Sequence, residues 1–210
     1  MHSASGRAPA APACWSCRAE GAGALFCAAC GAVQPPGAAD HFARLGLKRG
    51  FAVDKAELDR RYFALQRQLH PDRFVRRPPR ERAISQSQAA SLNEAYDVLR
   101  DPLSRAVYLL RQDGIDLEPA SGQTISDPDL LMEAMEMREA LAEAGDAPAV
   151  AAIAARVETD RQAALATLGQ AFAAGGNDGA RKATLRLKYL VKLAEDVRAR
   201  RAAMGAKASS

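Results

Sequence analysis

Apolar residues recur at helical spacing through the middle of the chain. In residues 58–69 they fall at i, i+4, i+7 and i+11, which predicts one amphipathic helix with a single buried stripe. A similar stripe in residues 84–99 predicts a second, antiparallel helix, and residues 73–82, rich in Arg and Pro, are expected to form the loop between them. Short helices are expected over residues 40–47 and 103–110. The predicted buried residues are Leu58, Tyr62, Leu65 and Leu69 on the first long helix, and Ile84, Gln88, Leu92, Ala95 and Leu99 on the second.

Three further helices are predicted in the C-terminal part of the chain. We expect Ser126 to cap the first of them, and Asp146 marks the start of the next. A double glycine at residues 175–176 ends this second helix, and Asn177 or Asp178 is expected to cap the third. Because the connections are short, the three helices should pack antiparallel as a bundle.

The first C-terminal helix carries more apolar residues than one buried face requires. Its three stripes are Leu130, Ala134, Met137 and Leu141, then Leu131, Met135 and Arg138, then Met132, Glu136 and Glu139. A helix packed on one side buries the first stripe but not all three. Leu131, Met132 and Met135 are therefore candidates for an exposed patch with an acidic rim. A wide core face filled by Met is the alternative, and the pattern alone favours neither.

Composition supports an all-α fold with several modules. Hydrophobic residues make up 48% of the 210 residues but aromatics only 5%, and the Ala-rich, Arg-rich sequence favours helix. We expect a disordered start and a small tetracysteine metal knuckle in residues 1–37 and a helical hairpin domain in residues 38–112. A linker in residues 113–125 and the three-helix domain in residues 126–205 follow, with a frayed tail from residue 200. No apolar stretch is long enough to span a membrane.

All four cysteines lie near the N-terminus, as Cys14-x-x-Cys17 and, nine residues later, Cys27-x-x-Cys30. Two such pairs can aim four thiolates at one tetrahedral ion, and this ligand set suits zinc best. Iron in a rubredoxin-like site uses the same ligands, and two disulfides would be the alternative in a secreted protein. Four protein ligands fill the coordination sphere, so we expect a structural metal and not a catalytic one.

A fixed loop, His70-Pro71-Asp72, follows the first long helix. Pro71 cannot continue a helix and pushes His70 towards an extended conformation, so the loop presents a carboxylate at a defined place. Arg60, Arg61 and Arg67 lie on one side of the preceding helix. By themselves these arginines indicate only a solvated face, but beside a fixed Asp72 they favour a docking surface for an acidic partner.

This arrangement, with Asn93-Glu94-Ala95-Tyr96-Asp97-Val98-Leu99 before Asp101-Pro102, resembles a J domain. J domains stimulate ATP hydrolysis by DnaK-class chaperones. The resemblance implies that His70, Pro71 and Asp72 contact the chaperone, and that Arg61 and Arg67 add charge pairing. Typical DnaJ chains carry basic residues directly after the tyrosine of this helix, whereas Phe63 and Ala64 follow Tyr62 here. This departure points to a specialised chaperone partner.

Three segments extend the resemblance to the HscB family, the J-proteins of iron–sulfur cluster biogenesis: residues 102–110, 131–139 and 185–193. The two cysteine pairs resemble the tetracysteine extension of its mitochondrial-type members. The resemblance implies an HscA-type chaperone and an IscU-type scaffold as partners. The residues it implies at the scaffold are Leu131, Met132, Met135, Glu136, Arg138, Glu139 and Tyr189.

The chain shows no catalytic constellation, so we expect a regulator of a partner ATPase and not an enzyme. Two alternatives remain: a general J-protein that delivers unfolded clients, and a zinc-knuckle protein that binds nucleic acid. The second is disfavoured because an acidic segment, residues 113–150, separates the two basic ones. We expect no nucleic-acid or membrane partner. The expected location is the bacterial cytoplasm, or the mitochondrial matrix if the source is eukaryotic.

Overall fold

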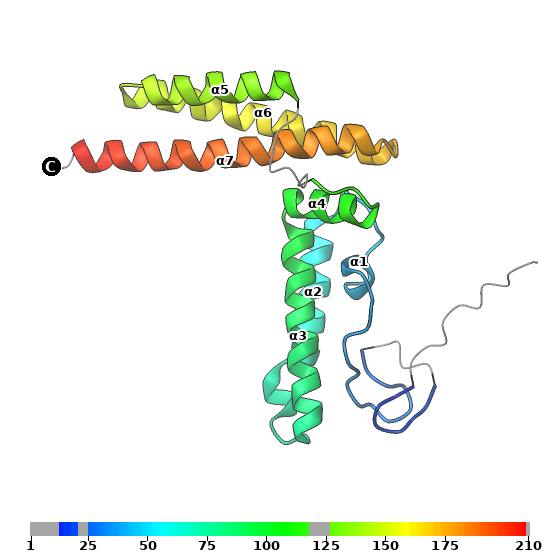
Figure 1. Cartoon of the computed structure of the whole chain (residues 1–210). Coiled ribbons are helices and arrows are strands. Elements are labelled where there is room, and N and C mark those ends of the chain that lie inside the picture. The colour runs from blue at the N-terminus through cyan, green and yellow to red at the C-terminus, as the bar shows by residue number, and fades with distance from the viewer. Residues whose placement is uncertain (1–12, 21–24, 118–126, 209–210) are drawn as a thin grey trace, which may run out of the picture. The chain divides into compact units, whose positions relative to one another are not determined.

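The computed structural model describes residues 13–20, 25–117 and 127–208, and these residues are mostly α-helical (Figure 1). They contain seven α-helices, one short 3-10 helix and a lone β-bridge between Phe26 and Val33, so the predicted all-α fold is confirmed. Within these ranges, no helix has the length and apolar character that crossing a bilayer would require. The elements are α1 (His41–Arg44), α2 (Lys55–Leu69), η1 (Pro71–Phe74), α3 (Pro79–Arg100), α4 (Pro102–Gln112), α5 (Pro128–Glu143), α6 (Ala147–Ala173) and α7 (Asn177–Ala208).

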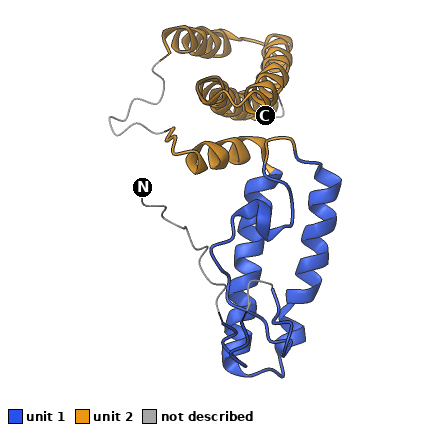
Figure 2. Cartoon of the chain, turned by 90° about the vertical axis from the view of Figure 1, so that its right-hand side faces the viewer, with its two compact units in different colours: residues 1–49, 53–100 blue, residues 50–52, 101–210 orange. Residues whose placement is uncertain are grey.

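The chain divides into two compact units (Figure 2). Unit 1 comprises residues 1–49 and 53–100, and unit 2 comprises residues 50–52 and 101–210. Helix α4 contributes Ala106 and Leu110 to the core of unit 2. The division therefore falls before α4, whereas the sequence pattern places the end of the hairpin domain after it, at residue 112. The domain boundaries inferred from the sequence stay a prediction.

Aspartates cap the starts of four long helices. Asp54 accepts hydrogen bonds from two backbone N–H groups in the first turn of α2. The caps of α4, α5 and α6 are Asp101, Asp127 and Asp146, and each of these helices also has a proline in its first turn. A proline costs nothing there, because the N–H groups of the first turn have no intrahelical partner. Ser126, the predicted cap of α5, lies outside the described residues.

Unit 1 is organised around the α2–α3 hairpin. The predicted apolar stripes face its interior, and Leu58, Leu69, Leu92 and Leu99 are almost completely buried. Tyr62 stacks on Tyr96 with ring centroids 4.0 Å apart. The Tyr96 hydroxyl donates a 2.8 Å hydrogen bond to Asp59, and this bond raises the pKa of Tyr96. The two tyrosines therefore join the helices by both stacking and a polar contact.

The connection between α2 and α3 is more helical than the sequence indicated. The predicted loop over residues 73–82 is wrong: η1 extends to Phe74, and α3 already begins at Pro79. Pro78 and Pro79 were interpreted as loop residues, but a proline at the first position of a helix has the required backbone angle and loses no hydrogen bond. The loop between η1 and α3 is therefore only residues 75–78.

Unit 2 contains the predicted three-helix bundle, with α5, α6 and α7 side by side in Figure 1. The apolar face of α6 is buried at Val150, Val157 and Leu168. Gly175, with φ +69°, terminates α6 in the left-handed conformation that glycine favours. The buried face of α7 includes Leu187, Leu190, Leu193 and Val197.

The prediction of a frayed tail from residue 200 is wrong. Helix α7 continues to Ala208. Residues 200–208 are rich in Ala and Arg and contain no proline, so their high helix propensity outweighs the single Gly205. Arg200 also donates a 3.0 Å hydrogen bond to the carbonyl of Ala144, the residue that ends α5. This contact ties the C-terminal part of α7 to the end of α5.

Candidate functional site

The four cysteine thiols converge on one point. All four Sγ atoms lie within 4.8 Å of one another, and the Cys14–Cys30 and Cys17–Cys27 separations are both 3.7 Å. A tetrahedral ion at ~2.3 Å from each sulfur would set these separations at about 3.8 Å, so the donor set fits a zinc-like ion. A disulfide needs ~2.05 Å, and all four cysteines are free. The disulfide alternative is therefore wrong.

Two similar turns aim the cysteines. In each, the carbonyl of the first cysteine accepts a hydrogen bond from the residue that follows the second: Arg18 N–H to Cys14 at 2.9 Å, and Gly31 N–H to Cys27 at 2.8 Å. Both of these residues have positive φ, +63° for Arg18 and +71° for Gly31. Gly31 adopts this conformation freely, whereas Arg18 does so at a cost, which indicates that the turn geometry is imposed by the site.

The environment of Cys14 favours its thiolate form. Cys14 is buried, and it accepts hydrogen bonds from the backbone N–H of Ser16 at 3.4 Å and the side-chain amide of Gln34 at 3.3 Å. Hydrogen bonding, chiefly from the backbone N–H of Cys17, lowers the pKa of Cys14 to about 6. Since metals bind the thiolate and not the thiol, this sulfur is prepared as a ligand.

The described part of the metal knuckle (residues 13–20 and 25–34) packs on α3 through buried amides. The Gln88 side chain donates a 2.7 Å hydrogen bond to the carbonyl of Gln34, and Gln34 in turn reaches Cys14. The Trp15 indole N–H bonds the Val33 carbonyl at 2.7 Å, and the Arg80 guanidinium lies 4.6 Å from the centre of the Trp15 ring. Sequence reasoning missed this link, although Gln88, a polar residue in an otherwise apolar stripe, was a signal for it.

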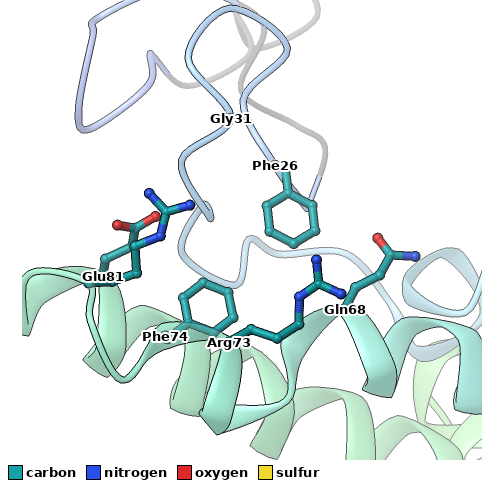
Figure 3. Close-up of a pocket in the computed structure, with 7 residues that line it drawn as sticks. Phe26, Gly31, Gln68, Arg73, Phe74 and Glu81 are labelled. Carbon is teal, nitrogen blue, oxygen red and sulfur yellow. The ribbon is translucent and has the colours of Figure 1, made fainter.

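A cavity of about 300 Å³ separates the knuckle from the end of the hairpin (Figure 3). Phe26 and Gly31 line it from the knuckle, and Gln68 of α2 lies on the opposite side. The remaining lining residues, Arg73, Phe74, Arg77 and Glu81, follow directly after His70-Pro71-Asp72 in the chain. The knuckle is thus a neighbour of the segment that presents this loop.

Asp72 is open to solvent at the end of the hairpin. His70 ends α2 with φ −54° and ψ 132°, the extended backbone that a following proline imposes. The Asp72 side chain is 85% exposed, and one of its oxygens lies 3.5 Å from His70 Nδ1. The same His70 nitrogen accepts a 3.4 Å hydrogen bond from the Asp72 N–H. The hydrogen bond from the Asp72 N–H to the imidazole fixes the backbone of the loop, and the carboxylate itself stays accessible.

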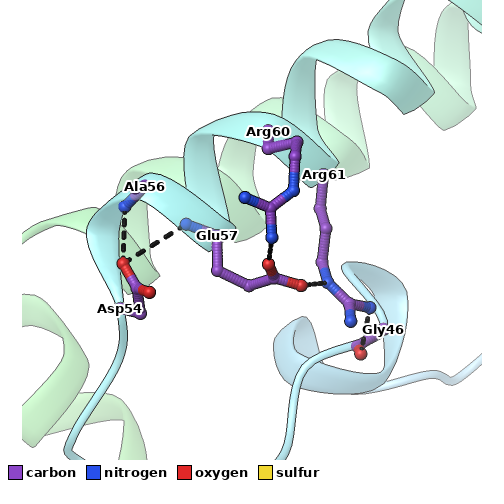
Figure 4. Close-up of polar contacts among 6 residues, drawn as sticks. All are labelled: Gly46, Asp54, Ala56, Glu57, Arg60 and Arg61. Atoms are coloured by element: carbon purple, nitrogen blue, oxygen red, sulfur yellow. Dashed lines mark hydrogen bonds and ion pairs between the residues drawn. The ribbon is translucent and has the colours of Figure 1, made fainter.

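The arginines of α2 differ in their contacts. Arg61 contacts both the Glu57 carboxylate and the carbonyl of Gly46 (Figure 4). Gly46 has φ +66°, a left-handed conformation that favours glycine, whereas an added Cβ would meet only the flexible end of Arg61. Glu57 also pairs with Arg60. Arg67 is exposed. The role of Arg61 at the chaperone stays a prediction, but part of its donor capacity is used within unit 1.

Helix α5 exposes the predicted apolar patch. Leu131, Met132 and Met135, the α5 patch, are 47%, 63% and 64% exposed. The first stripe is buried instead: Leu130, Ala134, Met137 and Leu141. The wide-core alternative is therefore wrong. The charged neighbours Glu136, Arg138 and Glu139 are exposed as well.

Tyr189 lies beneath α5 and not on its surface. It is only 5% exposed, its hydroxyl donates a 3.2 Å hydrogen bond to the Ala134 carbonyl, and burial raises its pKa. The guanidinium of Arg138 lies 5.9 Å from the centre of its ring. Nearby, Glu133 of α5 pairs with Arg186 of α7 at 2.6 Å. The contact of Tyr189 with the scaffold stays a prediction. The observed contacts of Tyr189 hold α5 on α7.

Two family models match the chain. Residues 40–108 match the DnaJ domain, and residues 126–198 match the HSCB C-terminal oligomerisation domain. The chain is also 34% identical to the mouse iron–sulfur cluster co-chaperone protein HscB, a match that covers 90% of this chain and 82% of the mouse protein. The chain belongs to the HscB family. It is thus a J-domain co-chaperone with a general role in iron–sulfur cluster assembly, and a regulator rather than a catalyst.

Relatives within the HscB family include bacterial proteins and solved structures. The chain is 40% identical to the co-chaperone protein HscB homolog of Cupriavidus taiwanensis, over 75% of this chain and 90% of that protein. The crystal structure of human HscB superposes with a TM-score of 0.85 at 33% identity and covers 90% of this chain and 98% of the human one. HscB from Vibrio cholerae gives a TM-score of 0.70 at 34% identity, over 79% and 99% of the two chains.

Proposed function

We propose that this HscB-family chain stimulates ATP hydrolysis by an HscA/DnaK-class chaperone through His70-Pro71-Asp72 while α5 binds an IscU-type scaffold. The observation that carries the proposal is the α5 patch. Three large apolar side chains stand exposed on a helix whose core stripe is already complete without them. About half or more of each of these side chains is exposed, and this surface would gain burial by binding a partner.

The chaperone side of the proposal rests on charge and exposure. The Asp72 carboxylate is accessible, and the exposed Arg60 and Arg67 lie on α2, the helix that precedes the loop. Arginine and a fixed carboxylate together favour a partner surface with acidic groups around a basic one. These groups would contact the ATP-bound chaperone and favour its hydrolysis-competent state.

The scaffold side combines apolar and acidic groups. Leu131, Met132 and Met135 would supply the buried contact, with Glu136, Arg138 and Glu139 around them. Methionine side chains adapt to irregular surfaces, which suits a partner that must also be released. Tyr189 would act at the scaffold through the position of α5.

We further propose that the knuckle holds zinc in a structural role. The four thiol donors and their separations suit zinc, and tetrahedral iron uses the same ligands. Metal analysis of the purified protein distinguishes the two ions. The expected result is about one zinc per chain. The proposed compartment is the cytoplasm of a bacterium, or the mitochondrial matrix if the source is eukaryotic.

In this proposal the protein couples two binding events. With scaffold on unit 2 and chaperone on unit 1, both partners are held on one chain at high effective concentration. The test is the steady-state ATPase rate of an HscA-class chaperone with this chain, with an IscU-type scaffold, with both and with neither. The expected result is greater stimulation by the pair than by the sum of the two.

Asp72→Ala provides the internal control for this test. It should abolish the stimulation and leave scaffold affinity unchanged, whereas Asp97→Ala, at another exposed aspartate of unit 1, should change neither. Stimulation that is indifferent to scaffold would indicate a general J-protein. A loss of scaffold affinity in Asp72→Ala equal to the loss of stimulation would contradict the assignment of the two functions to separate sites.

A further inference from the structure

One aromatic side chain of unit 1 stands in solvent. Phe63 is 51% exposed, although α2 buries Leu58 and Leu69 on its opposite side. At 100° per residue, Arg60 and Arg67, three residues before and four residues after Phe63, lie beside it on the outer face of α2. Phe63 is therefore the aromatic member of a basic face that ends at the Asp72 loop.

The position of Phe63 is fixed by a residue that is itself held in place. The Phe63 ring meets the edge of the Tyr62 ring with centroids 5.2 Å apart. Tyr62 stacks on Tyr96, and its hydroxyl lies 3.0 Å from Asn93 Oδ1 and accepts a 3.0 Å hydrogen bond from Gln66. A side chain packed on such an anchored ring loses little conformational entropy when a partner covers it.

We propose that Phe63 is an aromatic anchor of the chaperone-binding face and enters an apolar pocket of the ATPase chaperone that is bordered by acidic groups. This inference rests on the proposed function and specifies the partner's chemistry. The charges on the face argue for this occupant: Arg60 and Arg67 flank Phe63, so the surface that covers the ring must also accept two guanidinium groups. Aromatic residues and arginines are the side chains that most often dominate binding energy at interfaces.

An aromatic anchor also restricts which chaperone can bind. A lysine at this position would suit any acidic surface, because a flexible ammonium needs no shaped pocket. A phenyl ring gains binding energy only where the partner offers an apolar cavity, and it leaves carboxylates desolvated where the partner is uniformly acidic. Phe63 thus selects a chaperone with an apolar pocket and disfavours one with an acidic surface at the same place.

The test measures the concentration of this protein that half-saturates ATPase stimulation of the HscA-class chaperone from the same source, without scaffold. Phe63→Ala should raise this concentration about tenfold with an unchanged maximal rate. The half-saturating concentration of Phe63→Leu should lie between those of the parent protein and Phe63→Ala. Gln170→Ala, which removes an exposed side chain from α6 of unit 2, is the control and should have no effect under these conditions. Thermal unfolding should not distinguish Phe63→Ala from the parent.

Ionic strength and a charged substitution test the chemistry of the contact. The loss caused by Phe63→Ala should be the same at low and high salt, whereas the loss caused by Arg67→Gln should shrink as salt rises. Phe63→Lys should bind more weakly than the parent. Equal or tighter binding by Phe63→Lys would overturn the proposal, because the partner surface would then be acidic there.

The outcomes separate this inference from the proposed function. If the parent protein does not stimulate the chaperone, the proposed function itself fails. If the parent stimulates and Phe63→Ala matches it, only the anchor is overturned. If Phe63→Ala instead converts a self-associated protein into a monomer without changing stimulation, Phe63 faces a second copy of the chain, and the anchor is likewise overturned.

Discussion

At the scale of single residues, Tyr189 is a buried side chain that supports the helix carrying the α5 patch. Its ring supports α5 from below, its hydroxyl bonds the Ala134 carbonyl, and the Arg138 guanidinium lies over it. Arg138 is exposed on the same helix as the α5 patch. The ring and the hydroxyl should therefore contribute to unfolding free energy first and to scaffold binding only through α5.

Two substitutions of Tyr189 separate these contributions. Tyr189→Phe keeps the ring and should lower the free energy of unfolding by about 1 kcal/mol, the typical net value of one hydrogen bond. Tyr189→Ala should lower it by about 3–5 kcal/mol, because it leaves a cavity under α5. Urea unfolding measures both. A loss of scaffold affinity in Tyr189→Phe at unchanged stability would contradict the supporting role and indicate direct contact by the hydroxyl.

At the scale of elements, α5 presents two apolar faces, one buried in the core of unit 2 and one exposed. Leu130 and Met137 face the core of unit 2, and Leu131 and Met135 face solvent. These pairs come from one helix and have the same residue types, so each is a control for the other. Few comparisons separate folding from binding within one element so directly.

The prediction for α5 is a reciprocal pattern in two double variants. Leu131→Ala with Met135→Ala should leave the melting temperature nearly unchanged and abolish scaffold binding, measured by titration calorimetry. Leu130→Ala with Met137→Ala should destabilise the protein by about 2–5 kcal/mol for each site, measured by thermal unfolding. If the exposed pair costs as much stability as the buried pair, the α5 patch is part of the core and the proposed function loses its main support.

The sequence predicted the elements of this fold well where local rules decide them. The apolar stripes of α2 and α3 and the end of α6 at Gly175 depend only on residues within a few turns. The extent of α7 was missed because the contact of Arg200 with the Ala144 carbonyl joins residues 56 apart, and no periodic pattern records it. Pro79 was interpreted as a loop residue because proline both ends and begins helices.

The candidate sites could be predicted from the sequence where all residues of a site lie on one helix or in one short segment. The four cysteines and the α5 patch were found from spacing, and the structure removed the disulfide and wide-core alternatives. The burial of Tyr189 depends on how α5 lies on α7, and the use of Arg61 within unit 1 depends on the distant Gly46. Such tertiary contacts override what a single helix shows.

At the scale of the whole molecule, the contacts described for the metal knuckle all lie within unit 1. Gln34 joins Cys14 to Gln88 of α3, and Trp15 lies against Arg80 near the start of that helix. The cavity beside the knuckle is lined by residues that follow the Asp72 loop. All of these residues belong to unit 1. The folding free energy that a metal supplies at this site should therefore stabilise unit 1 and leave unit 2 unaffected.

Removal of the metal tests this expectation in the intact protein. Chelation, or Cys27→Ser with Cys30→Ser, should increase backbone hydrogen exchange in the knuckle, in η1 and in the first half of α3, because these segments lose the anchored Gln34–Gln88 contact. Hydrogen exchange in α6 and α7 should stay the same. Added zinc should restore the protection of unit 1 in the chelated protein but not in the double variant. Mass spectrometry of proteolytic fragments resolves the two units. Equal loss of protection in both would mean that the units fold as one, and unchanged protection in α3 would mean that Gln88 holds the helix without help from the metal.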